Sequence, residues 1–149
     1  MKTDPSERTG TGDGPRRYLV VANLTVGGEQ LAATIERRLR TGPCTFHVVV
    51  PASADPHTMT WTEEEALRSA RRRLDQVVSV LRAIRADVSG EVGDWTPMLA
   101  VADALRTRRF DEIIVVTLPP GPSRWIRLDL PRRIALRFGL PVGLVQVAA

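Results

Sequence analysis

The sequence predicts an α/β protein built on a doubly wound, five-stranded parallel sheet with helices on both faces. Short β-rich apolar runs alternate along the chain with longer segments whose apolar residues recur at helical spacing. This alternation implies parallel strands joined by right-handed crossovers, which cover both faces of a sheet. The length of 149 residues and the hydrophobic fraction of 43% suit one compact domain.

The composition of the chain changes near residue 16. Residues 1–16 are Gly, Ser, Thr, Pro and charged residues for the most part, so we expect a disordered tail, and we expect residues 17–149 to form the single folded domain. No apolar run approaches the roughly 20 residues of a membrane span, and the polar N-terminus carries no secretory signal. One cysteine excludes an internal disulfide framework. These features favour a cytoplasmic protein.

The first part of the domain should contain two buried strands separated by a helix. The apolar run 18–23 predicts the first strand. Leu31, Ile35 and Leu39 predict a helix over 29–40, which ends at Gly42-Pro43. The run 44–50 predicts the second strand.

The longest predicted helix begins at Thr62. The pair Thr62 and Glu65 fits a capping box, in which each residue satisfies a free backbone amide near the start of the helix. An apolar stripe predicts that this helix docks on the sheet. The stripe consists of Leu67, Ala70, Leu74, Val77, Val78, Leu81 and Ile84.

Three more strands and two more helices complete the expected fold. Residues 87–93 alternate in polarity, which predicts an edge strand. Thr96 as a cap and Pro97 as the first helical residue predict the start of the next helix. The remaining elements are a strand over 111–117, a short helix over 131–138 and a last strand over 142–147.

Candidate ligand-binding residues lie in the loops that follow the strands. Ligands of an open parallel sheet bind beyond the carboxyl ends of its strands, where the strand order reverses. Glycines after the first strand let backbone amides approach an anion at a helix N-terminus, and the loop after the fourth strand is stiff, basic and aromatic. The candidates are Asn23, Thr25, Gly27, Pro51, Thr117, Gly121, Ser123, Arg124, Trp125 and Arg127.

All three tryptophans, Trp61, Trp95 and Trp125, fall in these loops. They can form aromatic walls for a base or a partner, or they can act as hydrophobic lids over the top of the sheet. The second interpretation is favoured for any single tryptophan, because an exposed tryptophan normally covers something.

The sequence offers no convincing catalytic or metal-binding constellation. Ser123 could be combined with His57 and Asp129, but no G-x-S-x-G elbow is present. His47 lies within a predicted strand and is best interpreted as a core or edge histidine. Cys44 and the two histidines are unevenly spaced for zinc, and there is no phosphate-binding glycine motif. We therefore expect no catalytic residues, no metal and a protein that is not an enzyme.

The net charge of +4 comes almost entirely from arginine, with Lys2 as the single lysine. The arginines are spread over several segments, and the chain has one Tyr and three Phe. This composition is poor material for an aromatic stacking platform, so nucleic-acid binding is not expected.

Several segments resemble the universal stress protein family, whose members share an adenine-nucleotide-binding α/β fold. YLVVAN (18–23) looks like the family's opening strand, GEVGDWTPMLAVADAL (90–105) like its strand, turn and helix pattern, FDEIIVVT (110–117) like its fourth strand, and LPVGLVQV (140–147) like its last strand. The resemblance covers residues 17 to 147. It implies a stress-type regulator and a homodimer paired through the last strand, and we predict the strand order 3-2-1-4-5 with the switch point between strands 1 and 4.

The nucleotide signature of the resembling family is altered in this sequence. ATP-binding members carry Gly-x-x-Gly, nine residues and then Gly-Ser or Gly-Thr after strand 4. Here Thr117 stands at the first glycine, Pro120 near the second and Leu128-Asp129 at the last pair, and Asn23 replaces the usual Asp. Pro120 cannot donate a backbone hydrogen bond, and Asp129 would repel phosphate. An adenine nucleotide is thus the implied ligand, but ordinary ATP is expected to bind poorly.

A cluster of arginines accompanies these changes. Arg124, Arg127, Arg132 and Arg133 can rebuild an anion site with side chains, or they can form a solvated surface. The first function class is therefore a non-enzymatic stress-type regulator that binds a nucleotide or another phosphorylated small molecule. The second is a protein that has lost nucleotide binding and acts through protein partners. A hydrolase or transferase of the wider adenine-nucleotide fold ranks third.

Overall fold

The computed structural model describes residues 14–22, 28–52, 62–117 and 129–146. Five strands form one sheet in the order β3-β2-β1-β4-β5, and every neighbouring pair is parallel. The predicted fold class and strand order are therefore confirmed. The strands are β1 (Arg16–Ala22), β2 (Cys44–Pro51), β3 (Asp87–Gly93), β4 (Glu112–Thr117) and β5 (Val142–Gln146).

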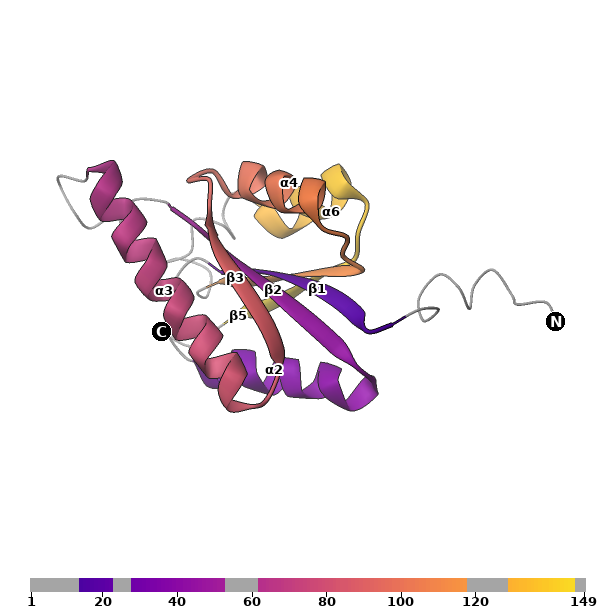
Figure 1. Ribbon diagram of the computed structural model, residues 1–149. Helices are drawn as coiled ribbons and strands as arrows, with labels where there is room; N and C mark the ends of the chain where they lie inside the picture. The colour runs from indigo at the N-terminus through magenta and orange to yellow at the C-terminus, as the bar shows by residue number, and fades with distance from the viewer. Residues whose placement is uncertain (1–13, 23–27, 53–61, 118–128, 147–149) are drawn as a thin grey trace.

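The helices cover both faces of the sheet (Figure 1). The helices α2 (Gly28–Thr41) and α3 (Glu63–Ala83) pack on one face, and α4 (Pro97–Thr107) and α6 (Leu130–Phe138) pack on the other. Successive side chains of a strand point to opposite faces. Val20 of β1 thus joins the core under α2 and α3, and Leu19 and Val21 join the core under α4 and α6.

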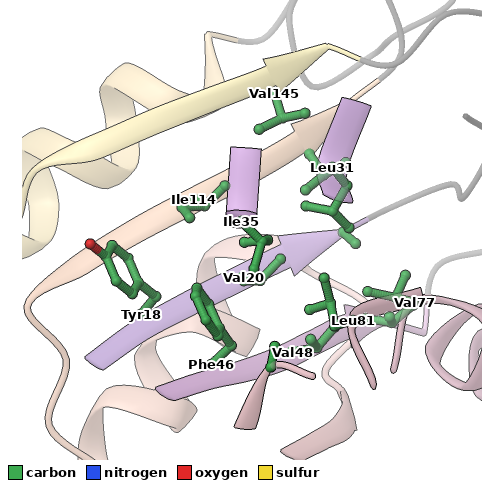
Figure 2. Packing of buried hydrophobic residues seen from close by; sticks show 14 of the residues in the cluster. Tyr18, Val20, Leu31, Ile35, Phe46, Val48, Val77, Leu81, Ile114 and Val145 are labelled. Atoms are coloured by element: carbon green, nitrogen blue, oxygen red, sulfur yellow. The ribbon is translucent and has the colours of Figure 1, made fainter. Parts of the chain in front are cut away.

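The core under α2 and α3 is the larger of the two. Figure 2 shows Leu31 and Ile35 of α2 and Leu81 of α3 packing on the sheet. Tyr18 of β1 and Phe46 of β2 stack side by side, with their ring centroids 5.2 Å apart. Since β1 and β2 lie within the sheet with partners on both sides, this core fixes the middle of the sheet to both helices.

The first strand begins close to the expected edge of the domain. β1 starts at Arg16, whose backbone N–H donates to the carbonyl of Pro43 at 3.0 Å. Residues 1–13 of the expected tail lie outside the described residues. None of the helices that the structure describes is long and apolar enough to cross a membrane.

The structure confirms the Thr62 half of the predicted capping box of α3 and corrects the predicted cap of α4. The Thr62 hydroxyl accepts a hydrogen bond from the backbone N–H of Glu65 at 3.1 Å. Thr96 stands at the N-cap of α4, but its hydroxyl makes no capping bond. Instead, the backbone N–H of Thr96 donates to Oδ1 of Asp94 at 2.9 Å. The turn before α4 is therefore closed by Asp94.

Leu67 was wrongly assigned to the core-facing stripe of α3. Its side chain is 42% exposed, whereas the preceding Ala66 is buried. The buried positions of the helix are Ala66, Ala70, Leu74, Val77 and Leu81. They recur at intervals of three or four residues, and this progression continues back to residue 66 rather than 67.

Candidate functional site

The switch point of the sheet lies between β1 and β4, as predicted. The ends of these strands are neighbours, because Ala22 pairs with Val116. From β1 the chain continues to α2 on one face, and from β4 it continues to α6 on the other. Chains that leave neighbouring strands toward opposite faces open a crevice at the carboxyl edge, which is where ligands of such sheets bind.

Two of the ten predicted site residues are described, and both lie at this carboxyl edge. Pro51 is the last residue of β2 and pairs with Gly93 of β3. Thr117 is the last residue of β4, pairs with Gln146 and is 1% exposed. One strand separates β2 from β4, so Pro51 and Thr117 are about 10 Å apart across the sheet. The other predicted residues, Asn23, Thr25, Gly27, Gly121, Ser123, Arg124, Trp125 and Arg127, lie outside the described residues.

A hollow lies beside these strand ends. It has a volume of about 440 Å³ and is lined by residues from the ends of β2 and β3, the start of α3 and the turn before α4. We call it the tryptophan hollow. Its lining comprises Ala52, Thr62, Glu63, Ala66, Leu67, Gly93, Asp94 and Trp95. The backbone N–H of Ala52 donates to the carbonyl of Gly93 at 3.1 Å, so its floor continues the β2–β3 ladder.

The walls of the tryptophan hollow are apolar and its rim is acidic. Trp95 is 69% exposed and Leu67 is 42% exposed, so both offer apolar surface to a ligand. Glu63 and Asp94 contribute the charges, and Oδ1 of Asp94 already accepts from the N–H of Thr96. Flat apolar walls beside carboxylate acceptors suit a ring that carries an N–H donor, and they disfavour a phosphate.

Trp95 does not act as a lid over the sheet. Its exposure favours the first of the two interpretations of the tryptophans, a wall of a binding surface. Trp61 and Trp125 lie outside the described residues. Ala52 and Leu67 were missed as site residues, because Ala52 carries no distinctive side chain and Leu67 matched the helical stripe.

The start of α6 coincides with the end of the altered nucleotide signature. Asp129 is its N-cap residue, is exposed and adopts a left-handed conformation with φ 56°. Its side chain makes no capping bond. Arg132 and Arg133 follow on the exposed side of the first turn. A carboxylate and two guanidinium groups therefore flank the point at which the chain returns from the carboxyl edge.

The described residues contain no group of three or more His, Cys, Asp and Glu side chains that could hold a metal ion. His47 is buried at 4% exposure and has hydrogen-bond partners on β3, which agrees with the prediction of a core or edge histidine.

Comparisons with known proteins bear on the fold. No protein-family model matches the sequence. No curated protein matches it either. Among solved structures, a universal stress protein from Archaeoglobus fulgidus matches with a TM-score of 0.60 and 17% sequence identity, over 88% of this chain and 93% of that chain. The likeness spans nearly the whole of both proteins, and this chain accordingly has the fold of a universal stress protein.

Proposed function

We propose that the protein is a cytoplasmic, non-enzymatic regulator of the stress-protein type that binds a nucleotide or another phosphorylated small molecule at the carboxyl edge of its sheet. The observation that carries the proposal is the tryptophan hollow, which opens at this edge at the ends of β2 and β3, next to β1 of the switch point. The fold supports the proposal, since ligand sites of open parallel sheets lie at this edge.

The dimensions of the edge suit a nucleotide. The hollow lies at the ends of β2 and β3, and β4 ends at Thr117 on the far side of β1. Neighbouring strands are about 4.8 Å apart, so about 10–14 Å separates the hollow from the end of β4. An aromatic ring against Trp95 would then direct its phosphates toward the segment that follows Thr117.

In this arrangement the anion is held by side chains. Arg124 and Arg127 would form charge-assisted hydrogen bonds to the phosphate, and Asn23, Thr25 and Gly27 would complete the site from the loop after β1. Pro120 removes one backbone donor, and the carboxylate of Asp129 opposes a long phosphate chain. An adenine nucleotide with one phosphate should therefore bind better than ATP.

We also propose that the protein is a homodimer paired through β5. Among the described strands, β5 pairs with β4 and forms one edge of the sheet. Leu144 of β5 is 45% exposed, and the strand carries no charged residue. Pairing with the same strand of a second subunit would cover this edge.

A protein partner is the alternative ligand. Three exposed apolar side chains come from segments near the carboxyl edge. They are Leu67 near the start of α3, Trp95 in the turn before α4 and Leu99 in the first turn of α4, which is 51% exposed. Exposed apolar patches of this kind also mark protein interaction sites.

Calorimetry with AMP, ATP and a cyclic nucleotide tests the proposed site. The wild type should bind AMP, and Trp95→Ala and Arg124→Ala should each weaken binding by about tenfold, whereas Arg71→Ala on the exposed side of α3 should leave it unchanged. Tight binding of ATP that Arg124→Ala does not affect would contradict the anion site. Absence of binding by all three nucleotides would favour the partner-binding alternative.

A further inference from the structure

A second cavity lies at the opposite, amino-terminal edge of the sheet. It has a volume of about 620 Å³, and we call it the amino-end pocket. Its floor is formed by the first residues of β1, β2 and β3, and its wall by the end of α4 and the residues that follow that helix. Its polar lining includes Arg17, His47, Ser89, Arg106, Arg108 and Arg109.

The floor of the amino-end pocket is polar because the sheet face that α4 covers changes from polar to apolar side chains along the strands. Further along, Leu19 and Val49 face α4 and are fully buried apolar residues. At the strand starts, the positions of the same parity are polar: Arg17, Thr45 and Asp87. This part of the sheet face is therefore built to meet water or a polar ligand rather than a helix.

A chain of hydrogen bonds links Glu91, His47 and Ser89 of the sheet to Arg108 in the wall of the pocket. Nε2 of His47 lies 2.7 Å from Oε2 of Glu91, and Nδ1 lies 2.8 Å from Oγ of Ser89. A carboxylate only accepts, so Nε2–H donates to Glu91, and in the neutral imidazole Nδ1 accepts from the Ser89 hydroxyl. The lone pairs of Oγ then remain for Nη1 of Arg108, which donates at 3.5 Å. Ser89 is thus a positioning residue for Arg108.

The charge of the lining is positive. Four arginines and one carboxylate, that of Asp87, line the pocket. Arg106 pairs with Asp103, whereas the guanidinium groups of Arg17 and Arg109 make no ion pair within the described part of the chain. Arg106 lies in the last turn of α4, where a positive charge is favourable to the helix dipole. The helix dipole does not account for Arg17, which belongs to β1, or for Arg109, which lies beyond the helix.

We propose that the amino-end pocket binds the phosphate group of a small molecule, separately from the carboxyl-edge site. Arg17, Arg108 and Arg109 supply guanidinium donors for a phosphate dianion. The ring of Phe110 stacks on His47 with a centroid distance of 6.1 Å and gives the pocket an aromatic flank. The volume lies within the range of small-molecule sites. The concave grouping of the arginines favours a small ligand over nucleic acid, which is bound along an extended stripe.

Calorimetry with inorganic pyrophosphate at low salt tests the proposal on the full chain. Arg108→Gln and Arg109→Gln should each weaken binding by about tenfold, because each removes a charge-assisted hydrogen bond. Both side chains are exposed, so the variants should fold normally. Ser89→Ala should weaken binding by about threefold through the loss of the Arg108 anchor, and Ser89→Thr should restore it. AMP is titrated as a second probe into Trp95→Ala, whose carboxyl-edge site is weakened. AMP binding that Arg109→Gln reduces in this background would indicate a nucleotide phosphate, and pyrophosphate binding alone would indicate a free phosphate.

Two control variants show whether pyrophosphate binding is specific to this pocket. Arg71→Gln makes the same charge change on α3, which packs on the opposite face of the sheet, and it should leave pyrophosphate binding within about twofold. Trp95→Ala should also leave pyrophosphate binding unchanged. The proposals for the carboxyl-edge site and for this pocket are therefore tested independently. Three outcomes would overturn the proposal. The first is an equal loss of pyrophosphate binding from Arg71→Gln and Arg109→Gln, and the second is no binding of pyrophosphate. The third is tighter binding of single-stranded nucleic acid that all three arginine variants weaken equally.

Discussion

Tyr18 and Cys44 lie among charged side chains near the amino-terminal ends of β1 and β2, on the face that α2 covers. The guanidinium carbons of Arg16 and Arg38 each lie 5.7 Å from the centroid of the Tyr18 ring. Both arginines also bind Glu112, at 3.4 and 2.8 Å. Burial raises the pKa of the Cys44 thiol, and burial together with Cys44 and Glu112 raises the pKa of the Tyr18 hydroxyl.

These raised pKa values predict a loss of stability at alkaline pH. The folded chain holds both protons more tightly than the unfolded chain, whose thiol and phenol ionise near their usual values of 9.0 and 10.0. The stabilisation is complete below pH 9 and is lost progressively as the pH rises above 9 and then above 10. Urea unfolding at pH 8 and pH 11 should show this loss, and Tyr18→Phe, which keeps the stacked ring, should reduce it.

Tyr18 is the single tyrosine in the chain, so its ionisation can be followed directly by near-ultraviolet absorbance. Titration of the folded protein should give an apparent pKa above that of the protein in urea. Equal values in the two states would contradict the assignment of the alkaline loss to Tyr18.

Gly93 at the end of β3 is required by close packing. A Cβ at this position would lie 2.8 Å from both Cβ of Ala100 and Cγ1 of Val49. Gly93→Ala should therefore destabilise the protein by about 1–3 kcal/mol, measured by urea unfolding. Gly143→Ala is the matched control, because its Cβ would meet only the movable ends of Arg38 and Glu112 at 3.3 and 3.4 Å. A loss at Gly143 as large as that at Gly93 would show that close packing is not what requires Gly93.

Among the elements, α3 and α4 begin in different ways although a threonine precedes each of them. Thr62 caps α3 with its hydroxyl, whereas the hydroxyl of Thr96 makes no capping bond and Asp94 closes the preceding turn. The same residue type in the same position thus contributes differently to the two helices.

This difference predicts unequal effects of removing the two hydroxyls. Thr62→Ala should cost about 1 kcal/mol, because the backbone N–H of Glu65 loses its acceptor. Thr96→Ala should change stability by less than about 0.5 kcal/mol. Thermal and urea unfolding of both variants would measure the contrast, and equal losses would show that the two caps are equivalent.

The elements also show what the sequence could predict. Apolar runs and helical spacing were sufficient to predict all five strands. The order of the strands was predicted together with the family resemblance, because spacing along the chain does not determine which strands are neighbours. The amino-end pocket was not predicted. Thr45 and His47 alternate with Cys44 and Phe46, which is the pattern of a strand with one polar face, but the following run of valines made the whole strand look buried. Such a pocket depends on where α4 ends, which side-chain spacing alone does not determine.

At the scale of the whole molecule, the two edges of the sheet differ in chemistry. The edge strand β3 exposes Asp87 and Glu91, whereas β5 exposes Leu144 and carries no charge. Association through β5 would bury apolar surface, whereas association through β3 would desolvate carboxylates.

The proposed dimer makes a prediction that distinguishes two apolar surfaces. Leu144→Lys on β5 should convert the dimer to a monomer, because a lysine on an edge strand opposes edge-to-edge pairing. Leu136→Lys on α6, where the native side chain is 73% exposed, should leave the dimer intact. Light scattering at micromolar concentration measures both variants. A monomeric wild type, or dissociation by Leu136→Lys alone, would contradict pairing through β5.

The unequal edges have a consequence for how far assembly can proceed. A sheet with two adhesive edges can add subunits at either end and grow into a fibre. Here Asp87 and Glu91 lie exposed on one edge strand, so the proposed association would have only the other edge for attachment. In the proposed dimer, two subunits paired through β5 would present only their charged outer edges to further copies, and assembly would stop at two. The acidic edge strand would thereby set an upper limit on size and protect a concentrated protein against polymerisation.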